Sequence, residues 1–254
     1  MRTTVVLTER MLTHWRRHPV VPVQSLLLPT LLLLTYHLVV SRSMVRLTGA
    51  DNLTALVPMC TVAGAMMGTI GAGFHLTAER DSGLLSRFWV HPVPRGALLA
   101  GTLAAEAVRT LGAGLVILGV GMLLGLRFHG GWLAFAGFLA IPMVVIVVFA
   151  TVVVAVSVRS RSTALLTLLG TASIGMAFCT GAVAPVEHFP EWLQPAIRLQ
   201  PLTPVVAAMR ALAEGEPAGP ALLGAAGWLV VLGAVFGPMA VRGYRAAAQS
   251  GGAG

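Results

Sequence analysis

The chain has 254 residues, of which 56% are hydrophobic and only 10% are charged, and its mean hydropathy is +0.85. Soluble domains carry about 25% charged residues, so this composition indicates an integral membrane protein. The net charge of +8 comes entirely from arginine, because the sequence contains no lysine. A conventional P-loop needs a lysine at the nucleotide phosphates, so we do not expect this chain to hydrolyse ATP.

The N-terminal residues 4–18 place Leu7, Met11 and Trp15 at helical spacing among three arginines. This pattern is typical of an interfacial helix that lies along a membrane surface. A basic anchor that only sets the topology is the alternative, and the sequence does not separate the two.

Six apolar runs follow, each long enough to cross a bilayer core of about 30 Å, which takes roughly 20 helical residues. They cover residues 20–40, 54–76, 98–126, 132–157, 163–185 and 221–240. None alternates apolar and polar residues as the strands of a membrane barrel do. We therefore expect an all-α membrane protein in which residues 1–254 form one domain with six transmembrane helices. Gly64, Gly68 and Ala72 form a ridge of small residues that favours close helix packing.

The arginines indicate the orientation of the spans, because cytoplasmic segments of membrane proteins are enriched in positive charge. With the N-terminus in the cytoplasm, the cytoplasmic segments hold Arg2, Arg10, Arg16, Arg17, Arg80, Arg87, Arg95, Arg159, Arg161, Arg242 and Arg245. The outer segments then hold only Arg42, Arg46, Arg127, Arg198 and Arg210. Six spans return the C-terminus to the cytoplasm, so we expect both termini on that side.

The loop between the second and third runs, residues 78–96, reads AERDSGLLSRFWVHPVPRG. Acidic residues open it, apolar residues at helical spacing follow, and prolines close it. Acids at the start of a helix suit the helix dipole, and proline ends a helix. We expect a short amphipathic helix at the cytoplasmic membrane surface, which suits docking into a groove on a partner.

Glu106 and Arg109 lie three residues apart inside the third run, so they share one helix face. Ionisable residues within a membrane are candidates for function. The alternative, which we favour, is a structural or interfacial pair whose charges reach toward lipid headgroups.

The segment 186–213 is too polar to span and contains four prolines. Trp192 is placed as an anchor at the membrane interface. An ordinary outer loop with one interfacial tryptophan is the alternative.

The seven histidines and two cysteines show no ligand spacing, so we expect no metal site. No catalytic motif supports an intramembrane enzyme. The arginines flank membrane spans, so we expect no nucleic-acid partner despite the basic charge.

Several segments in order resemble the ABC transporter type-2 permease family, and most closely its daunorubicin-resistance branch. They are RRHPVVPVQSLLLP, ERDSGLLSRFWVHPVPRGALLAGTLAAEAVRTL, LRFHGGWLAF and VAPVEHFPEWLQPAIRLQPLTPVVAAMRAL. The resemblance implies a permease subunit that exports a hydrophobic or amphiphilic drug, antibiotic or lipid. ATP and Mg²⁺ would bind a separate ATPase chain, with no cofactor on this one.

The resemblance also implies partners and a location. A six-span chain would be half of the membrane assembly, so a homodimer or a heterodimer with a second permease is implied, within membrane lipid. Arginine without lysine is typical of GC-rich bacterial genomes, so we expect the plasma membrane of a bacterium.

The family's coupling helix, which docks on the ATPase, matches residues at about 79–92 within the 78–96 loop. The matching residues are Glu79, Arg80, Asp81, Gly83, Leu84, Arg87, Phe88, Pro92 and Arg95. The pair of Glu106 and Arg109 would stabilise the cytoplasmic gate or this helix. The outer segment would be a re-entrant or outer-leaflet element that caps the exit path, marked by Pro190, Trp192, Pro201, Thr203 and Pro204.

Two other functions remain open. A secondary carrier or channel would work without ATP, and a membrane scaffold would transport nothing. Neither needs a docking helix in the 78–96 loop.

Overall fold

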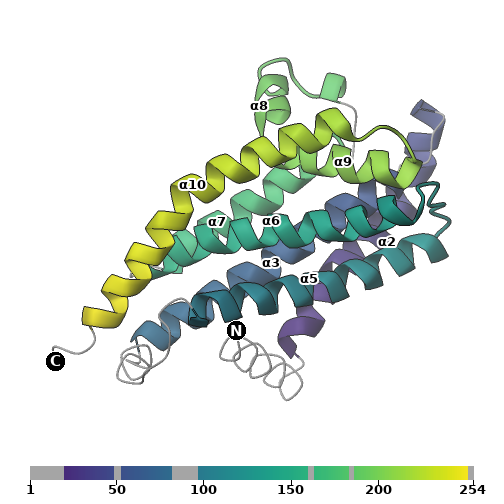
Figure 1. Ribbon diagram of the computed structural model, residues 1–254. Coiled ribbons are helices and arrows are strands. Elements are labelled where there is room, and N and C mark those ends of the chain that lie inside the picture. Colours follow the sequence, from purple (N-terminus) through teal and green to yellow (C-terminus); the bar gives the residue numbers. More distant parts are fainter. Residues whose placement is uncertain (1–19, 49–52, 82–96, 160–162, 183–185, 251–254) are drawn as a thin grey trace.

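Residues 20–48, 53–81, 97–159, 163–182 and 186–250 are described in the computed structural model of the chain (Figure 1). All regular elements within these ranges are helices. They are α2 (Val20–Thr48), α3 (Leu53–Asp81), α5 (Ala97–Leu123), α6 (Trp132–Arg159), α7 (Thr163–Phe178), η1 (Val186–His188), α8 (Gln194–Leu199), α9 (Leu202–Glu214) and α10 (Gly219–Ser250). The expected interfacial helix at 4–18 lies outside the described residues.

Four of the described helices are long and apolar enough to cross a membrane. Their spanning segments are Leu53–Ala78, Ala100–Leu123, Trp132–Arg159 and Gly219–Gly243. Two further apolar segments, Leu26–Val39 and Thr163–Phe178, are shorter. The prediction of an all-helical, multi-pass membrane protein is therefore confirmed for the described part of the chain.

The third apolar run was expected to continue to residue 126, but α5 ends at Leu123. Gly125 follows with a φ of +110°, a backbone conformation that only glycine adopts readily. The amide of Leu126 donates to the carbonyl of Gly121 at 2.9 Å, which closes the turn. The predicted bound was too long because residues 124–126 are as apolar as the helix, and hydropathy alone does not detect a turn.

The fifth run was expected to reach residue 185, whereas α7 ends at Phe178. The chain turns over residues 179–182, where Gly181 has a φ of +76°. The side chain of Gln200 donates to the free carbonyl of Cys179 at 2.5 Å. A distant side chain thus satisfies one of the carbonyls that the end of a helix leaves unpaired.

Helix α3 lies at the centre of the bundle, in contact with α2, α5, α6, α7 and α9. In its spanning segment, 83% of the most apolar stretch of 18 residues is buried inside the protein, against 6% of the corresponding stretch of α10. Small residues permit the close packing: Gly73 lies against Val153 of α6, and Gly121 of α5 lies against Val57 of α3. Helix α10 runs along the outside of the bundle (Figure 1).

Candidate functional site

A buried ion pair joins Glu106 and Arg109 on α5. The Nη2 atom of Arg109 lies 2.6 Å from Oε2 of Glu106, and Nε lies 3.2 Å from the same oxygen. Only 5% of the arginine side chain and 2% of the glutamate side chain are exposed. The two residues are one helical turn apart, which brings their side chains together on one face.

This face of α5 contacts the centre of α3. The hydroxyl of Thr69 donates to Oε2 of Glu106 at 2.8 Å, and Nη2 of Arg109 donates to the carbonyl of Ala65 at 3.0 Å. The guanidinium therefore points at a neighbouring helix, which favours a link between helices over a charge that reaches toward lipid headgroups.

Gly68 makes this approach possible. A Cβ atom at position 68 would overlap the guanidinium of Arg109. The small-residue ridge of α3 thus admits a charged side chain at this position. Sequence reasoning found the ridge and the pair separately, but it had no signal that they meet.

The pair is not fully satisfied by hydrogen bonds. The Nη1 atom of Arg109 is buried and has no partner among the described residues. By contrast, the buried hydroxyls of Thr61, Thr77 and Ser157 each donate to a carbonyl one turn earlier in their own helix. Thr69 does the same at 3.1 Å to Ala65, and shares its proton with Glu106.

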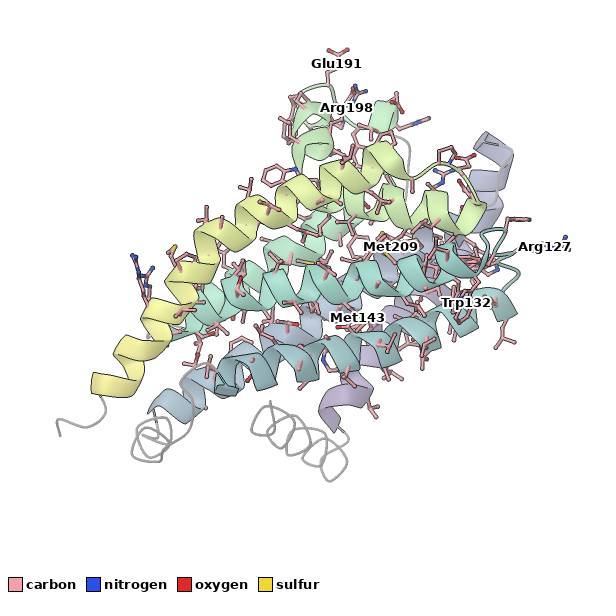
Figure 2. The ribbon with its side chains drawn as sticks, in the orientation of Figure 1. Arg127, Trp132, Met143, Glu191, Arg198 and Met209 are labelled. Carbon is pink, nitrogen blue, oxygen red and sulfur yellow. The ribbon has the colours of Figure 1, made fainter. Side chains whose placement is uncertain are left out.

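Helix α9 is the main element of the predicted outer segment. The buried side of α9 consists of Leu202, Val205, Val206, Ala208, Met209 and Ala213. The helix contacts α3, α6, α7 and α10, and Met209 lies inside the bundle (Figure 2). The sequence pattern of four prolines did not reveal that this segment contributes a face to the core.

The predicted markers of the outer segment lie in its turns and in the first turn of α9. Thr203 donates to the carbonyl of Ile197 at 2.6 Å and so fixes the corner between α8 and α9. Pro201 immediately precedes α9, and Pro204 lies against Gly224 of α10. Pro190 and Trp192 are exposed, with 78% of Trp192 accessible. Glu191 and Arg198 project away from the bundle in the same region (Figure 2).

A polar contact holds the other end of α9, and it was not anticipated from the sequence. Oε1 of Glu214 accepts hydrogen bonds from Thr54 at the start of α3, at 2.7 Å, and from Arg210, at 2.9 Å. Next to it, the amide of His129 donates to the carbonyl of Ala213 at 2.8 Å. We call the contact of Thr54, Arg210 and Glu214 the outer latch.

The residues expected to dock on a partner are described only in part. Gly83, Leu84, Arg87, Phe88, Pro92 and Arg95 lie outside the described residues. Glu79, Arg80 and Asp81 form the last turn of α3, but their side chains are not described. Their backbone thus continues the central helix, and α5 begins at Ala97 directly after this segment.

No group of three His, Cys, Asp or Glu side chains that could hold a metal ion is found within the described ranges. Cys60 and Cys179 are free thiols.

Comparison with known proteins gives the following similarities. Residues 2–213 match the family described as ABC-2 type transporter. The chain is 32% identical to the probable doxorubicin resistance ABC transporter permease protein DrrC of Mycobacterium tuberculosis over 246 aligned residues. The alignment covers 96% of this chain and 88% of that protein. It is 28% identical to the daunorubicin resistance ABC transporter permease protein DrrB1 of Streptomyces coeruleorubidus, over 93% of this chain and 83% of that protein.

Proposed function

Since the chain belongs to the ABC-2 type transporter family, we propose that it is the permease subunit of an ATP-driven exporter for a hydrophobic or amphiphilic substrate. The observation that carries this proposal is the similarity to doxorubicin and daunorubicin resistance permeases over more than nine-tenths of the chain. A drug or antibiotic is thereby favoured as substrate, and a lipid is the remaining class.

The energy source is proposed from the sequence. A chain without lysine has no P-loop lysine, so ATP and Mg²⁺ would bind a separate ATPase subunit. Residues 82–96, together with the last turn of α3 before them, would dock on that subunit as the coupling element. The full membrane unit would be a homodimer or a heterodimer with a second permease.

The topology is part of the same proposal. Six spans place both termini in the cytoplasm, as the arginine distribution favours. The 16 residues of α7 are only about 24 Å long at 1.5 Å per residue, which is less than the bilayer core. Because α9 contacts the same helices as α7, it would complete the outer part of this span as a re-entrant cap over the exit path.

The ion pair of Glu106 and Arg109 would act as a clamp within this machine. It links α3 to α5, and these are the two helices that flank the proposed coupling segment. Motion of the segment would reach both helices, and the clamp would make them move together. This role extends the expected stabilisation of the cytoplasmic gate.

The proposal is tested by purifying the chain from its native membranes in mild detergent and identifying what accompanies it. We expect a stoichiometric P-loop ATPase. Inverted vesicles that contain the complex should then accumulate doxorubicin when ATP is added. The fluorescence of doxorubicin measures this accumulation. A chain that purifies alone and transports only with an ion gradient would instead establish a secondary carrier.

A further inference from the structure

Two arginines lie near the same end of the helix pair α6 and α10. Arg159 is the last residue of α6, and Arg242 lies at the end of the spanning segment of α10. At Gly243, an added Cβ would lie 3.6 Å from Cβ of Val158 and 3.8 Å from Cγ of Arg159. The residue next to Arg242 therefore packs directly against the stem of Arg159.

Helices α6 and α10 are parallel neighbours, so their last residues lie at the same end of the bundle. Near their starts, Gly215 lies against His129, and at their other ends Gly243 lies against Val158. Between them, Val154, Ala155, Val158 and Ala240 form a buried cluster. Both spanning segments thus end at the same membrane surface.

Neither guanidinium has an anionic partner among the described side chains. Arg109, Arg198 and Arg210 each pair with a glutamate, at 2.6, 3.5 and 2.9 Å. Arg159 and Arg242 are exposed, and no ion pair or hydrogen bond involves their side chains in the described part of the chain. The described part of the chain thus supplies no counterion for these two charges at this end of the bundle.

The surface beside these charges is apolar. Val241 is 38% exposed, and the outer side of α10 continues with the exposed residues Val235, Val231 and Val230. The two cations and the apolar helix face beside them match the anionic headgroup and the acyl chains of a phospholipid. Guanidinium groups bind phosphate oxygens with paired, charge-assisted hydrogen bonds.

We propose that Arg159 and Arg242 form a binding site for the phosphodiester headgroup of an anionic phospholipid, whose acyl chains lie along α10. Basic residues between transmembrane helices at a membrane surface are suited to such headgroups. The inference requires only that the chain spans a membrane, so it does not depend on the proposed export activity.

The experiment measures lipid retention by the intact purified chain with native mass spectrometry. The probes are phosphatidylglycerol, which is anionic, and phosphatidylcholine, which is zwitterionic. We expect preferential retention of phosphatidylglycerol, and a loss in its apparent affinity of about fivefold in each of Arg159→Gln and Arg242→Gln. Arg127→Gln is the matched control, because Arg127 is also exposed and has no partner among the described residues, but lies at the opposite end of the bundle (Figure 2).

Three results would overturn the proposal. One is equal retention of phosphatidylglycerol in wild type and both variants. Another is an equal loss in Arg127→Gln, which would indicate attraction by net charge alone. The third is complete displacement of the lipid by millimolar inorganic phosphate, which would indicate a plain phosphate site.

A second measurement needs no variant and is therefore safe from effects on membrane insertion. Hydrogen exchange of the wild-type chain is compared in nanodiscs of the two lipids. We expect phosphatidylglycerol to slow exchange at the ends of the α6 and α10 spanning segments, near 155–159 and 240–243. Equal exchange in both lipids contradicts the site.

Discussion

At the residue scale, Glu106 and Arg109 show how a charge pair is tolerated in an apolar bundle. Each charge is neutralised by the other, and Thr69 and Ala65 of α3 supply further hydrogen bonds. Removing one member of a buried pair leaves an uncompensated charge, whereas replacing both by apolar residues is often neutral for stability. This asymmetry separates a structural role from a role in transport.

Glu106→Gln should lower the free energy of unfolding by about 3–5 kcal/mol, because Arg109 keeps its charge without a counterion. Glu106→Met combined with Arg109→Met should unfold within about 1 kcal/mol of wild type, because no buried charge remains. Thermal unfolding in detergent measures both. If the pair is a clamp, the stable double variant should still export more slowly than wild type.

The clamp hypothesis has a direct counter-test in the charge exchange. Full transport in Glu106→Arg/Arg109→Glu, and also in each single variant, would show that the pair has no special role in export.

Gly68→Ala should destabilise the chain by about 1–3 kcal/mol, because the new methyl group overlaps the guanidinium of Arg109 and overpacks the interface. Gly71→Ala is the matched control on the same helix, since a Cβ there meets nothing within 4 Å. Unfolding temperatures of the two variants check this. A similar loss in both would mean that helix α3 itself, and not the arginine contact, requires glycine.

At the element scale, α9 differs from the spanning helices in having one buried face and a polar edge. Its apolar side chains pack into the bundle, while the outer latch holds its C-terminal end against α3. Before the helix, the backbone of Gln200 is extended and Pro201 forms the N-cap. After the helix, Gly215 forms the C-cap with a φ of +76°. Helix α9 is thus a short rigid unit between two breaks, which suits an element that caps an exit path.

Thr54→Val should loosen the C-terminal end of α9, because the hydrogen bond to the Glu214 carboxylate is lost while the side chain keeps its shape. A hydrogen bond to a charged group contributes about 1.5–3 kcal/mol. Hydrogen exchange over 205–214 should become faster. Glu216→Gln, which changes an exposed acid two residues beyond Glu214, should leave these rates unchanged, and unchanged rates in Thr54→Val would show that the latch does not hold the helix.

At the scale of the whole molecule, the arrangement of α3 and α5 connects the proposed coupling segment to the core. Helix α3 has the most central position, and it leads into residues 82–96 without a break before Asp81. A push on that segment would therefore act on the most buried of the four long apolar helices that the structure describes. The outer surface of α10, by contrast, faces away from the bundle and suits contact with lipid.

Glu79→Lys and Gly83→Pro should weaken association with the ATPase while the chain still inserts into the membrane. The first reverses a charge in the last turn of α3, where the proposed docking residues begin, and the second puts a helix-breaking proline into the proposed coupling helix. Co-purification of the ATPase measures the effect. Glu216→Lys is the control, because it makes the same charge change at the opposite end of the bundle, and undiminished co-purification in both test variants would contradict docking through this segment.

The sequence by itself determined the class of protein, because hydropathy and charge are local properties that the bilayer selects residue by residue. It also determined the family, through an ordered set of motifs, and it singled out Glu106 and Arg109 from their spacing alone. The approximate positions of the long apolar helices followed from the same local properties.

The tertiary structure decided what these residues meet. Arg109 bonds a carbonyl 44 positions away, and Glu214 bonds a hydroxyl 160 positions away, so no local pattern contains either contact. The turn after α7 involves the side chain of Gln200 and the backbone of Gly181, and the parallel packing of α6 and α10 brings Gly243 against Arg159. The physical reason is the same in each case: hydropathy places a helix in the membrane, but only packing sets its rotation and its neighbours.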